Sequence, residues 1–431
     1  MRWMRQLSAE VEETAEVVGG KAHGLVVLHR LGLPVPAAFV VTTEACRAFL
    51  RDGRLPDGLE DELAAAITGF DVVSVRSGAA VSMPGMMNTI LDVKLTSADV
   101  ARSAVESVFS SWKAPRARTY RELHDIPHDL GTAVIVQKMV FGDHDEHSGT
   151  GVAFSRDPNT GAHVPFGDVL FGHRGEDVVS GRSQPFPLRA LADREPLVWT
   201  GLLDALSRAE AHYRDACHVE FTYQSGELWL LQVRPGGFTG AAAVRVATEL
   251  AEEGVIDQRE ALLRVSPHHL QHVRTPRIAP EATVAFRGLG ACPGVATGRV
   301  AITADAAVRM AADGPVVLVR PETSPHDMRG LAAATGIVTA RGGPASHAAV
   351  VARAMGKPAV VGVGELVLSE GTLVTIDGTS GEVVLGEPRV VMSTAEAHLH
   401  RLLHWADEVS GDHSERDEVH RLRAAHAVLR R

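Results

Sequence analysis

Along the first 240 residues, short apolar runs typical of strands alternate with segments whose apolar positions recur at helical spacing. Strand-like apolar runs occur in PAAFVVT around Val40, in GTAVIVQKMV around Val136 and in LWLLQV around Leu230. Segments with helical spacing lie between these runs. A chain that alternates strands and helices in this way predicts a mixed α/β or α+β domain over residues 1–240.

The pattern changes three more times after residue 240. Residues 241–285 begin with an Ala-rich helical segment and end in RTPRIAPEATVA, where Pro276 and Pro280 predict a linker. Residues 286–387 predict a second compact domain, because they contain short apolar runs around Val317, Val338, Val360 and Val374. Residues 388–431 are polar and predict a C-terminal helical tail.

Length and composition narrow the class of protein. The 431 residues suffice for two or three cores, and a formal charge of -10 argues against a nucleic-acid-binding surface. The three cysteines are widely spaced and suit a reducing compartment, and no apolar stretch is long enough to span a bilayer. The 21 histidines show no metal-ligand spacing. We therefore expect a soluble cytoplasmic protein without a signal peptide, a membrane or a nucleic-acid partner.

A single histidine is the strongest candidate for chemistry. His347 lies in RGGPASHAAVVARAMGKPAVVG, between the turn formed by Gly342 and Gly343 and an amphipathic helix that Ser346 can cap. Backbone N–H groups at a helix start favour an anionic group, which suits an imidazole that becomes phosphorylated. The alternative is a capping or core histidine.

Two glycine-rich segments in the first half have the character of phosphate sites. VGGKAHGL, residues 18–25, places two glycines before Lys21, which can meet a phosphate as a point charge. SVRSGAAVSMPGMMNTIL, residues 74–91, follows Arg76 with a loop of small residues whose N–H groups can approach phosphate oxygens. Common surface turns are the alternative for both segments.

A third segment, HVEFTYQSGELWLLQVRPG, predicts a β-hairpin that turns at residues 224–226. We expect Glu220 and Gln232 to face one side of the two strands, with Arg234 two residues further along on that side. Oxygen ligands of this kind suit Mg²⁺ that bridges nucleotide phosphates. An ordinary hairpin with outward polar residues is the alternative.

Taken in order, these segments resemble pyruvate phosphate dikinase and phosphoenolpyruvate synthase, enzymes that make or use phosphoenolpyruvate. VQKMVFG, SGTGVAFSRDPNTG and GEDVVSG add matches in the first half, and GLGACPGVATGRV, RPETSPHDM and TIDGTSGEVV flank the His347 segment. The resemblance implies an ATP-grasp-like nucleotide-binding domain over residues 1–240. It also implies a swivelling β/β/α phosphohistidine domain over residues 286–387, with hinges near 274–285 and 386–394.

The resemblance also implies roles for individual residues. His347 is the phosphate carrier, Lys21 and Arg76 bind phosphate, and Glu220, Gln232 and Arg234 line the ATP–magnesium site, in which Glu220 and Gln232 are the metal ligands. Two positions depart from the family. His218 replaces the aspartate two residues before the glutamate, which weakens the magnesium assignment. Ala345 replaces a regulatory threonine two residues before the histidine.

The similarity continues to HWADEV, residues 404–409, where the family enters its C-terminal barrel. Such a barrel needs about 250 residues, so we expect a short form without the phosphoenolpyruvate/pyruvate site. The expected function is ATP-dependent phosphorylation of His347, release of AMP and transfer of phosphate to a separate protein or a small molecule. The alternatives are a self-sufficient small-molecule kinase and a non-catalytic nucleotide-binding partner of a full-length enzyme.

Overall fold

The computed structural model describes residues 2–81, 83, 85–174, 185–238, 240–343, 346–394, 396–414 and 416–430. The chain divides into two compact units. The nucleotide unit, as we name the first, comprises residues 1–150, 171–174 and 219–234. The carrier unit comprises residues 151–170, 175–218 and 235–431.

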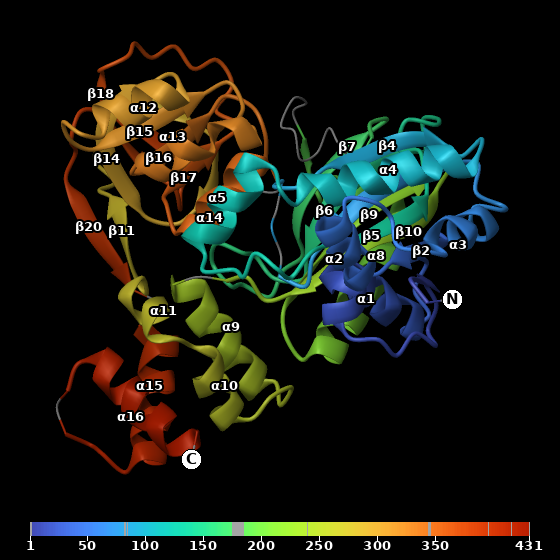
Figure 1. Ribbon diagram of the computed structural model, residues 1–431. Coiled ribbons are helices and arrows are strands. Elements are labelled where there is room, and N and C mark those ends of the chain that lie inside the picture. The colour runs from blue at the N-terminus through green and yellow to red at the C-terminus, as the bar shows by residue number, and fades with distance from the viewer. Residues whose placement is uncertain are drawn as a thin grey trace. The chain divides into compact units, whose positions relative to one another are not determined.

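An antiparallel sheet of order β1-β2-β5-β3-β4 forms the core of the nucleotide unit. Its strands are β1 (Met4–Gln6), β2 (Ala38–Val41), β3 (Val72–Gly78), β4 (Thr89–Lys94) and β5 (Ala133–Lys138). The helices of this unit are α1 (Ala15–Arg30), α2 (Thr43–Asp52), α3 (Leu59–Ala66), α4 (Ala98–Ser111) and α5 (Pro115–Leu123). Apolar side chains of α2, α3 and α4 pack on the sheet, and the labels of Figure 1 locate these elements along the chain. The strands predicted around Val40 and Val136 are confirmed as β2 and β5.

A second five-stranded sheet has the order β10-β9-β6-β7-β8. Its strands are β6 (Gly149–Phe154), β7 (Phe166–Phe171), β8 (Phe186–Pro187), β9 (Cys217–Gln224) and β10 (Glu227–Pro235). Helices α7 (Ala190–Arg194) and α8 (Pro196–Tyr213) precede β9. The predicted hairpin is confirmed, since β9 and β10 are joined through Ser225 and Gly226, both with positive φ. Two such residues are typical of the tight type I′ turn.

The carrier unit contains an eight-stranded sheet of order β12-β19-β18-β14-β15-β16-β17-β13. Strands β14 (Val295–Ala301), β15 (Val316–Arg320), β16 (Gly336–Thr339) and β17 (Ala359–Val361) run parallel. Strands β12 (Phe286–Arg287), β13 (Leu289–Cys292), β18 (Leu373–Asp377) and β19 (Glu382–Leu385) complete it, with helices α12 (Ala304–Met310), α13 (Met328–Ala333) and α14 (His347–Met355) and the 3-10 turn η1 (Pro325–Asp327). All four predicted apolar runs are strands of this sheet, and β15, β16 and β17 are almost entirely buried. Burial on both faces explains why they read as continuous apolar runs.

A helical group in the same unit combines two segments that are distant in sequence. Helices α9 (Gly240–Glu252), α10 (Gln258–Arg264) and α11 (Pro267–Gln271) share one apolar core with α15 (Glu396–Ser410) and α16 (Glu418–Leu429). Leu250, Leu262, Leu402 and Leu422 are completely buried in this core.

The two predicted hinge segments pair with each other. Strands β11 (Arg274–Ile278) and β20 (Val390–Thr394) form an antiparallel ribbon in which Pro276 lies opposite Met392. The expectation of a helical tail from residue 388 is therefore wrong for residues 390–394. Completely buried Asp377 of β18 accepts hydrogen bonds from the Arg277 side chain (2.8 Å) and the Ile278 N–H (3.0 Å). This carboxylate fastens the ribbon to the eight-stranded sheet. Among the described residues, no helix is both long and apolar enough to cross a membrane.

Candidate functional site

Two glycine turns come into direct contact at the start of the nucleotide unit. Gly19 interrupts α1 with φ of 80°, and a Cβ atom there would lie 1.7 Å from the carbonyl oxygen of Gly78. Gly20 donates its N–H to the carbonyl of Ala79 (3.0 Å). Only glycine fits this approach. The contact places Lys21 beside the loop that follows Arg76.

Arg76 connects that loop to the hairpin. Its Nη2 donates to Glu220 Oε2 (2.9 Å) and to Gln232 Oε1 (3.3 Å), and its Nη1 donates to the carbonyl of Leu231 (3.1 Å). The Gln232 side chain is almost fully buried, and its Nε2 has no hydrogen-bond partner among the residues that the structure describes. A buried amide nitrogen of this kind is a donor available to a bound ligand.

Three cations and one carboxylate interact electrostatically here. Burial, together with the charges of Arg76 and Arg234, lowers the pKa of Lys21 to about 7, although Glu220 opposes the shift. Burial likewise lowers the pKa of Arg234, with Glu220 opposing and Arg76 adding to the shift. The structure thus brings Lys21, Arg76, Glu220, Gln232 and Arg234 together. The excess of positive charge suits a polyphosphate.

The structure describes some of the other predicted parts of the nucleotide site and leaves others outside the described residues. The His218 ring lies 5.2 Å from the ring of Phe154, both within the carrier unit. The SVRSGAAVSMPGMMNTIL segment is described except for Ser82 and Pro84, and the GEDVVSG match lies outside the described residues, as does Ala345. Arg116 supports the described end of the Arg76 loop, since it donates to the Met86 carbonyl and to Asn88 (both 2.9 Å).

His347 is the first residue of α14, as the sequence predicts. Ser346 has the extended backbone of an N-cap residue, but its side chain makes no capping hydrogen bond. The turn before it requires glycine, because Gly342 has φ of 96° and a Cβ atom on Gly343 would lie 2.2 Å from Asp168 Oδ2. His347 is therefore presented from a glycine turn at a helix start.

The two nitrogens of His347 have different surroundings. Nδ1 lies 3.1 Å from the hydroxyl oxygen of buried Thr323, whereas buried Nε2 has no hydrogen-bond partner among the described residues. Burial lowers the pKa of His347 to about 4, against the opposing charge of Asp327. The imidazole is therefore neutral at physiological pH. Thr323 belongs to the RPETSPHDM segment, whose sequence by itself does not identify it as the partner of His347.

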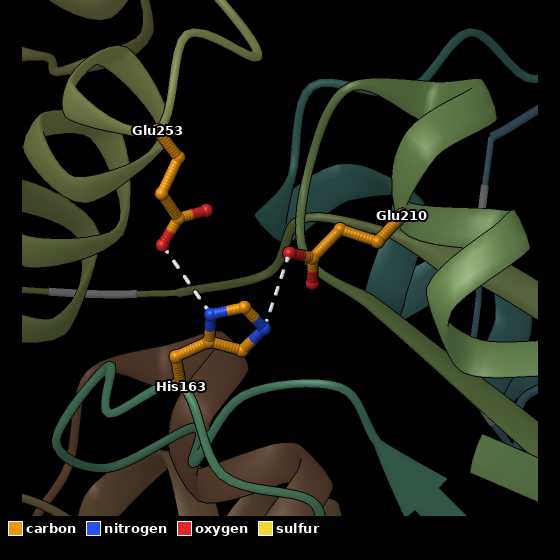
Figure 2. Close-up of side chains that lie close together, drawn as sticks. All are labelled: His163, Glu210 and Glu253. Carbon is orange, nitrogen blue, oxygen red and sulfur yellow. Dashed lines mark ion pairs between the residues drawn. The ribbon is translucent and has the colours of Figure 1, made fainter. Parts of the chain in front are cut away.

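A second charged cluster in the carrier unit was not predicted at all. Completely buried Arg156 forms ion pairs with Glu210 (2.7 Å), Glu249 (3.3 Å) and Glu253 (2.6 Å). Figure 2 shows His163 between two of these carboxylates, with Nδ1 at 3.3 Å from Glu253 and Nε2 at 3.8 Å from Glu210. The spacing of His163, Glu210 and Glu253 would suit a metal ion. Because Arg156 forms ion pairs with both carboxylates, we interpret the cluster as an ion-pair network that joins α8 to α9.

Models of two known domain families match the segments that contain these residues. A model of the PEP-utilising enzyme mobile domain matches residues 312–381, which include His347. A model of the pyruvate phosphate dikinase AMP/ATP-binding domain matches residues 15–72 and 51–198, which include Lys21 and Arg76. The predicted mixed α/β fold with a nucleotide-binding domain followed by a mobile domain is confirmed.

Individual proteins extend the similarity over nearly the whole chain. Pyruvate, phosphate dikinase of Rhizobium meliloti (strain 1021) is 34% identical over an alignment of 525 residues that covers 92% of this chain and 58% of that protein. The enzyme of Clostridium symbiosum is 33% identical and covers 94% of this chain and 60% of that protein. The chain thus spans less than two thirds of the length of these relatives. Among solved structures, D-alanyl-alanine synthetase A of Vibrio cholerae gives a TM-score of 0.32 at 13% identity, covering 57% of this chain and 63% of that one.

Proposed function

Because the chain belongs to the pyruvate phosphate dikinase family of PEP-utilising enzymes, we propose that it is an ATP-dependent phosphotransferase with His347 as the phosphate carrier. One observation supports this most directly. His347 begins a helix, its Nδ1 is engaged by Thr323, and its Nε2 remains without a partner among the described residues. A neutral imidazole in this state is a nucleophile positioned for phosphoryl transfer.

The nucleotide unit would bind the triphosphate of ATP. Lys21, Arg76 and Arg234 supply positive charge, and the turns at Gly19 and Gly78 bring backbone close to the loop after Arg76. Phosphoryl transfer depends mainly on positioning and on charge neutralisation, so such a set of cations is sufficient machinery for binding.

The residues present are compatible with a magnesium ion, although they form a sparse donor set. Glu220 and Gln232 offer one carboxylate and one amide oxygen, and both oxygens face Arg76. Mg²⁺ commonly uses one or two carboxylates together with substrate phosphates and water. We propose that Glu220 and Gln232 hold this ion, which would neutralise phosphate charge when bound. His218 cannot replace the missing carboxylate as a hard oxygen ligand.

Dikinase chemistry at His347 would proceed as follows. The Nε2 lone pair attacks the β-phosphorus of ATP, the bond from that phosphorus to the oxygen bridging the α-phosphate breaks, and AMP leaves. Transfer of the terminal phosphoryl group to inorganic phosphate then leaves one phosphate on His347. Thr323 would keep the Nδ1 proton in place during the attack, because an Nδ1–H that donates to the hydroxyl leaves the lone pair on Nε2.

The phosphate would then pass to an acceptor, either a separate protein or a small molecule. A carrier domain can serve two sites when it rotates about linkers, and we propose that the β11–β20 ribbon is the linker in this chain. One feature favours a second candidate, a non-catalytic nucleotide-binding partner of another enzyme. It is the replacement of a family carboxylate by His218.

Labelled ATP tests these alternatives. The full chain is incubated with Mg²⁺ and ATP labelled at the β- or γ-phosphate, and acid-labile label on the protein is measured together with AMP and ADP. His347→Ala should remove the label while ATP binding persists. His326→Ala is the matched control, since His326 is an exposed histidine in the same domain.

Each outcome points to one function. Label from β-phosphate with release of AMP supports the dikinase reaction. Label from γ-phosphate with ADP indicates an ordinary kinase step, in line with a self-sufficient small-molecule kinase. Absence of label with intact ATP binding indicates the non-catalytic partner, and label that survives His347→Ala refutes the assignment of the carrier residue.

A further inference from the structure

The nucleotide unit contains a basic cavity that the proposed function does not use. It has a volume of about 540 Å³ and lies among the end of α2, the end of α4, helix α5 and the turn that follows α5. Its lining includes the cations Arg47, Arg51, Lys113, Arg118 and Arg121. Two carboxylates, Glu122 and Asp129, also line it, and both residues are exposed.

Arg121 is the unusual member of this lining. The residue is only 2% exposed, and its guanidinium lies 4.2 Å from the centre of the Trp112 ring. Its Nε donates to His128 Nδ1 (3.0 Å), whereas its Nη1 has no hydrogen-bond partner among the described residues. No carboxylate of the described part of the chain forms an ion pair with it. A buried guanidinium without an anion is costly, and an anion from outside the chain would remove this cost.

The neighbouring cations leave the cavity positively charged. Arg47 and Lys113 donate to the backbone carbonyls of Leu130 (3.3 Å) and Leu50 (3.0 Å), which carry no net charge. Arg51 is paired with Asp52 outside the lining, and Arg118 forms no ion pair with the described residues. Burial, and next the charge of Arg118, lower the pKa of Arg121, and Glu122 opposes this shift. The cations of the lining therefore repel one another and would be stabilised by a common anion.

We propose that this cavity binds the phosphate group of a small molecule. The planar fork of a guanidinium matches the oxygens of phosphate, and a buried, pre-positioned arginine loses little entropy when it binds. The volume falls in the range of small-molecule sites and exceeds what a single phosphate ion fills. A phosphate ester therefore fits better than free phosphate, and both share the chemistry that Arg121 and Arg118 recognise. The site is distinct from Lys21, Arg76 and Glu220, none of which lines the cavity.

Calorimetric titration of the full chain with phenyl phosphate and with inorganic phosphate tests the site. All titrations use a chain with the substitution Arg76→Gln, which is expected to weaken phosphate binding at the proposed nucleotide site. In this background, the second substitution Arg121→Gln should weaken binding of the phosphate probes by about 10-fold to 100-fold, the effect of losing a hydrogen bond from a charged group. The further substitution Arg118→Gln should weaken it by up to about 5-fold, as expected for an exposed charge. Arg54→Gln, at an exposed arginine outside the cavity, is the matched control and should have no effect.

The results separate the interpretations. Tighter binding of phenyl phosphate supports an ester, and equal or tighter binding of inorganic phosphate supports the free ion; both support the site. The proposal is overturned if the Arg76→Gln chain binds neither probe, or if Arg118→Gln and Arg54→Gln bind equally well. Since Arg118 is exposed, its replacement is expected to fold, and the test stands even if the Arg121 variant unfolds.

Discussion

Replacement of Thr323 by valine tests how the protein controls the reactive nitrogen of His347. Thr323 is buried, and its hydroxyl oxygen lies 3.1 Å from His347 Nδ1. Valine has nearly the same shape, so it removes the hydrogen bond and leaves the packing in place. Any loss of phosphorylation then reports on the tautomer and orientation of the ring.

The magnitude follows from the partner that the ring loses. An Nδ1–H left buried without an acceptor costs about 1–3 kcal/mol, and this penalty falls on the tautomer whose lone pair is on Nε2. Because about 1.4 kcal/mol corresponds to a factor of ten, the rate of phosphorylation should fall by roughly 5-fold to 150-fold. Thr323→Ser keeps the hydroxyl and should restore most of the rate.

The assay is the initial rate of acid-labile labelling of the full chain from labelled ATP at saturating ATP and Mg²⁺. ATP binding, measured separately, should be unchanged in both variants, because Thr323 belongs to the carrier unit. The pH profile between 5 and 8 provides a second readout. With the pKa of His347 near 4, protonation of this ring should not limit the wild-type rate in this range.

A valine variant that is labelled as fast as the wild type would refute the proposed role of Thr323. An equal loss of labelling rate in the serine and valine variants would also contradict this role, because the loss would then result from altered packing and not from the missing hydroxyl. If the rate of the wild-type protein falls with a midpoint near pH 6.5 that Thr323→Val shifts, the ring is not kept neutral by burial as we infer.

Three further predictions concern the charged groups. Replacing Arg76 with glutamine removes the donor shared by Glu220 and Gln232, and equilibrium dialysis should show ATP affinity reduced by about 10-fold to 100-fold. The pKa of Lys21 is about 7, so its side chain is mostly charged below that pH and mostly neutral above it. ATP affinity should therefore fall by up to about tenfold between pH 7 and pH 8.5. Lys21→Met should abolish this pH dependence. Arg156→Ala leaves buried Glu210 without its guanidinium and should lower the free energy of unfolding by about 3–5 kcal/mol in denaturant titrations; a loss below 1 kcal/mol would contradict the network.

Local patterns in the sequence were sufficient for several buried strands and for the chemical candidates. Runs such as VVLVR and LVTID are buried on both faces. A strand buried on both faces consists mostly of apolar residues, so such a run indicates a buried strand. Glycine positions were equally informative, because a close backbone approach such as that of Gly19 to Gly78 excludes every side chain. His347, Lys21 and Arg76 could be singled out for the same reason, since each lies next to such a turn.

Contacts between segments that are distant in sequence could not be predicted in this way. The pairing of Arg274 with Thr394 joins strands about 120 residues apart, and each strand by itself reads as a linker or part of a polar tail. Thr323, the partner of His347, lies in another segment, and nothing in its own neighbourhood identifies the nitrogen that it contacts.

The sequence by itself determined which segments are buried, where the backbone must turn tightly, and which side chains are chemically able to carry or bind phosphate. Only the tertiary structure decided which buried charges have partners. Arg156 and Arg121 both have almost no exposed surface, yet Arg156 forms ion pairs with three carboxylates, whereas Arg121 forms an ion pair with no carboxylate of the described residues. The physical reason is that local periodicity records the burial of a residue, whereas the free energy of a buried charge depends on groups that the fold brings from elsewhere in the chain.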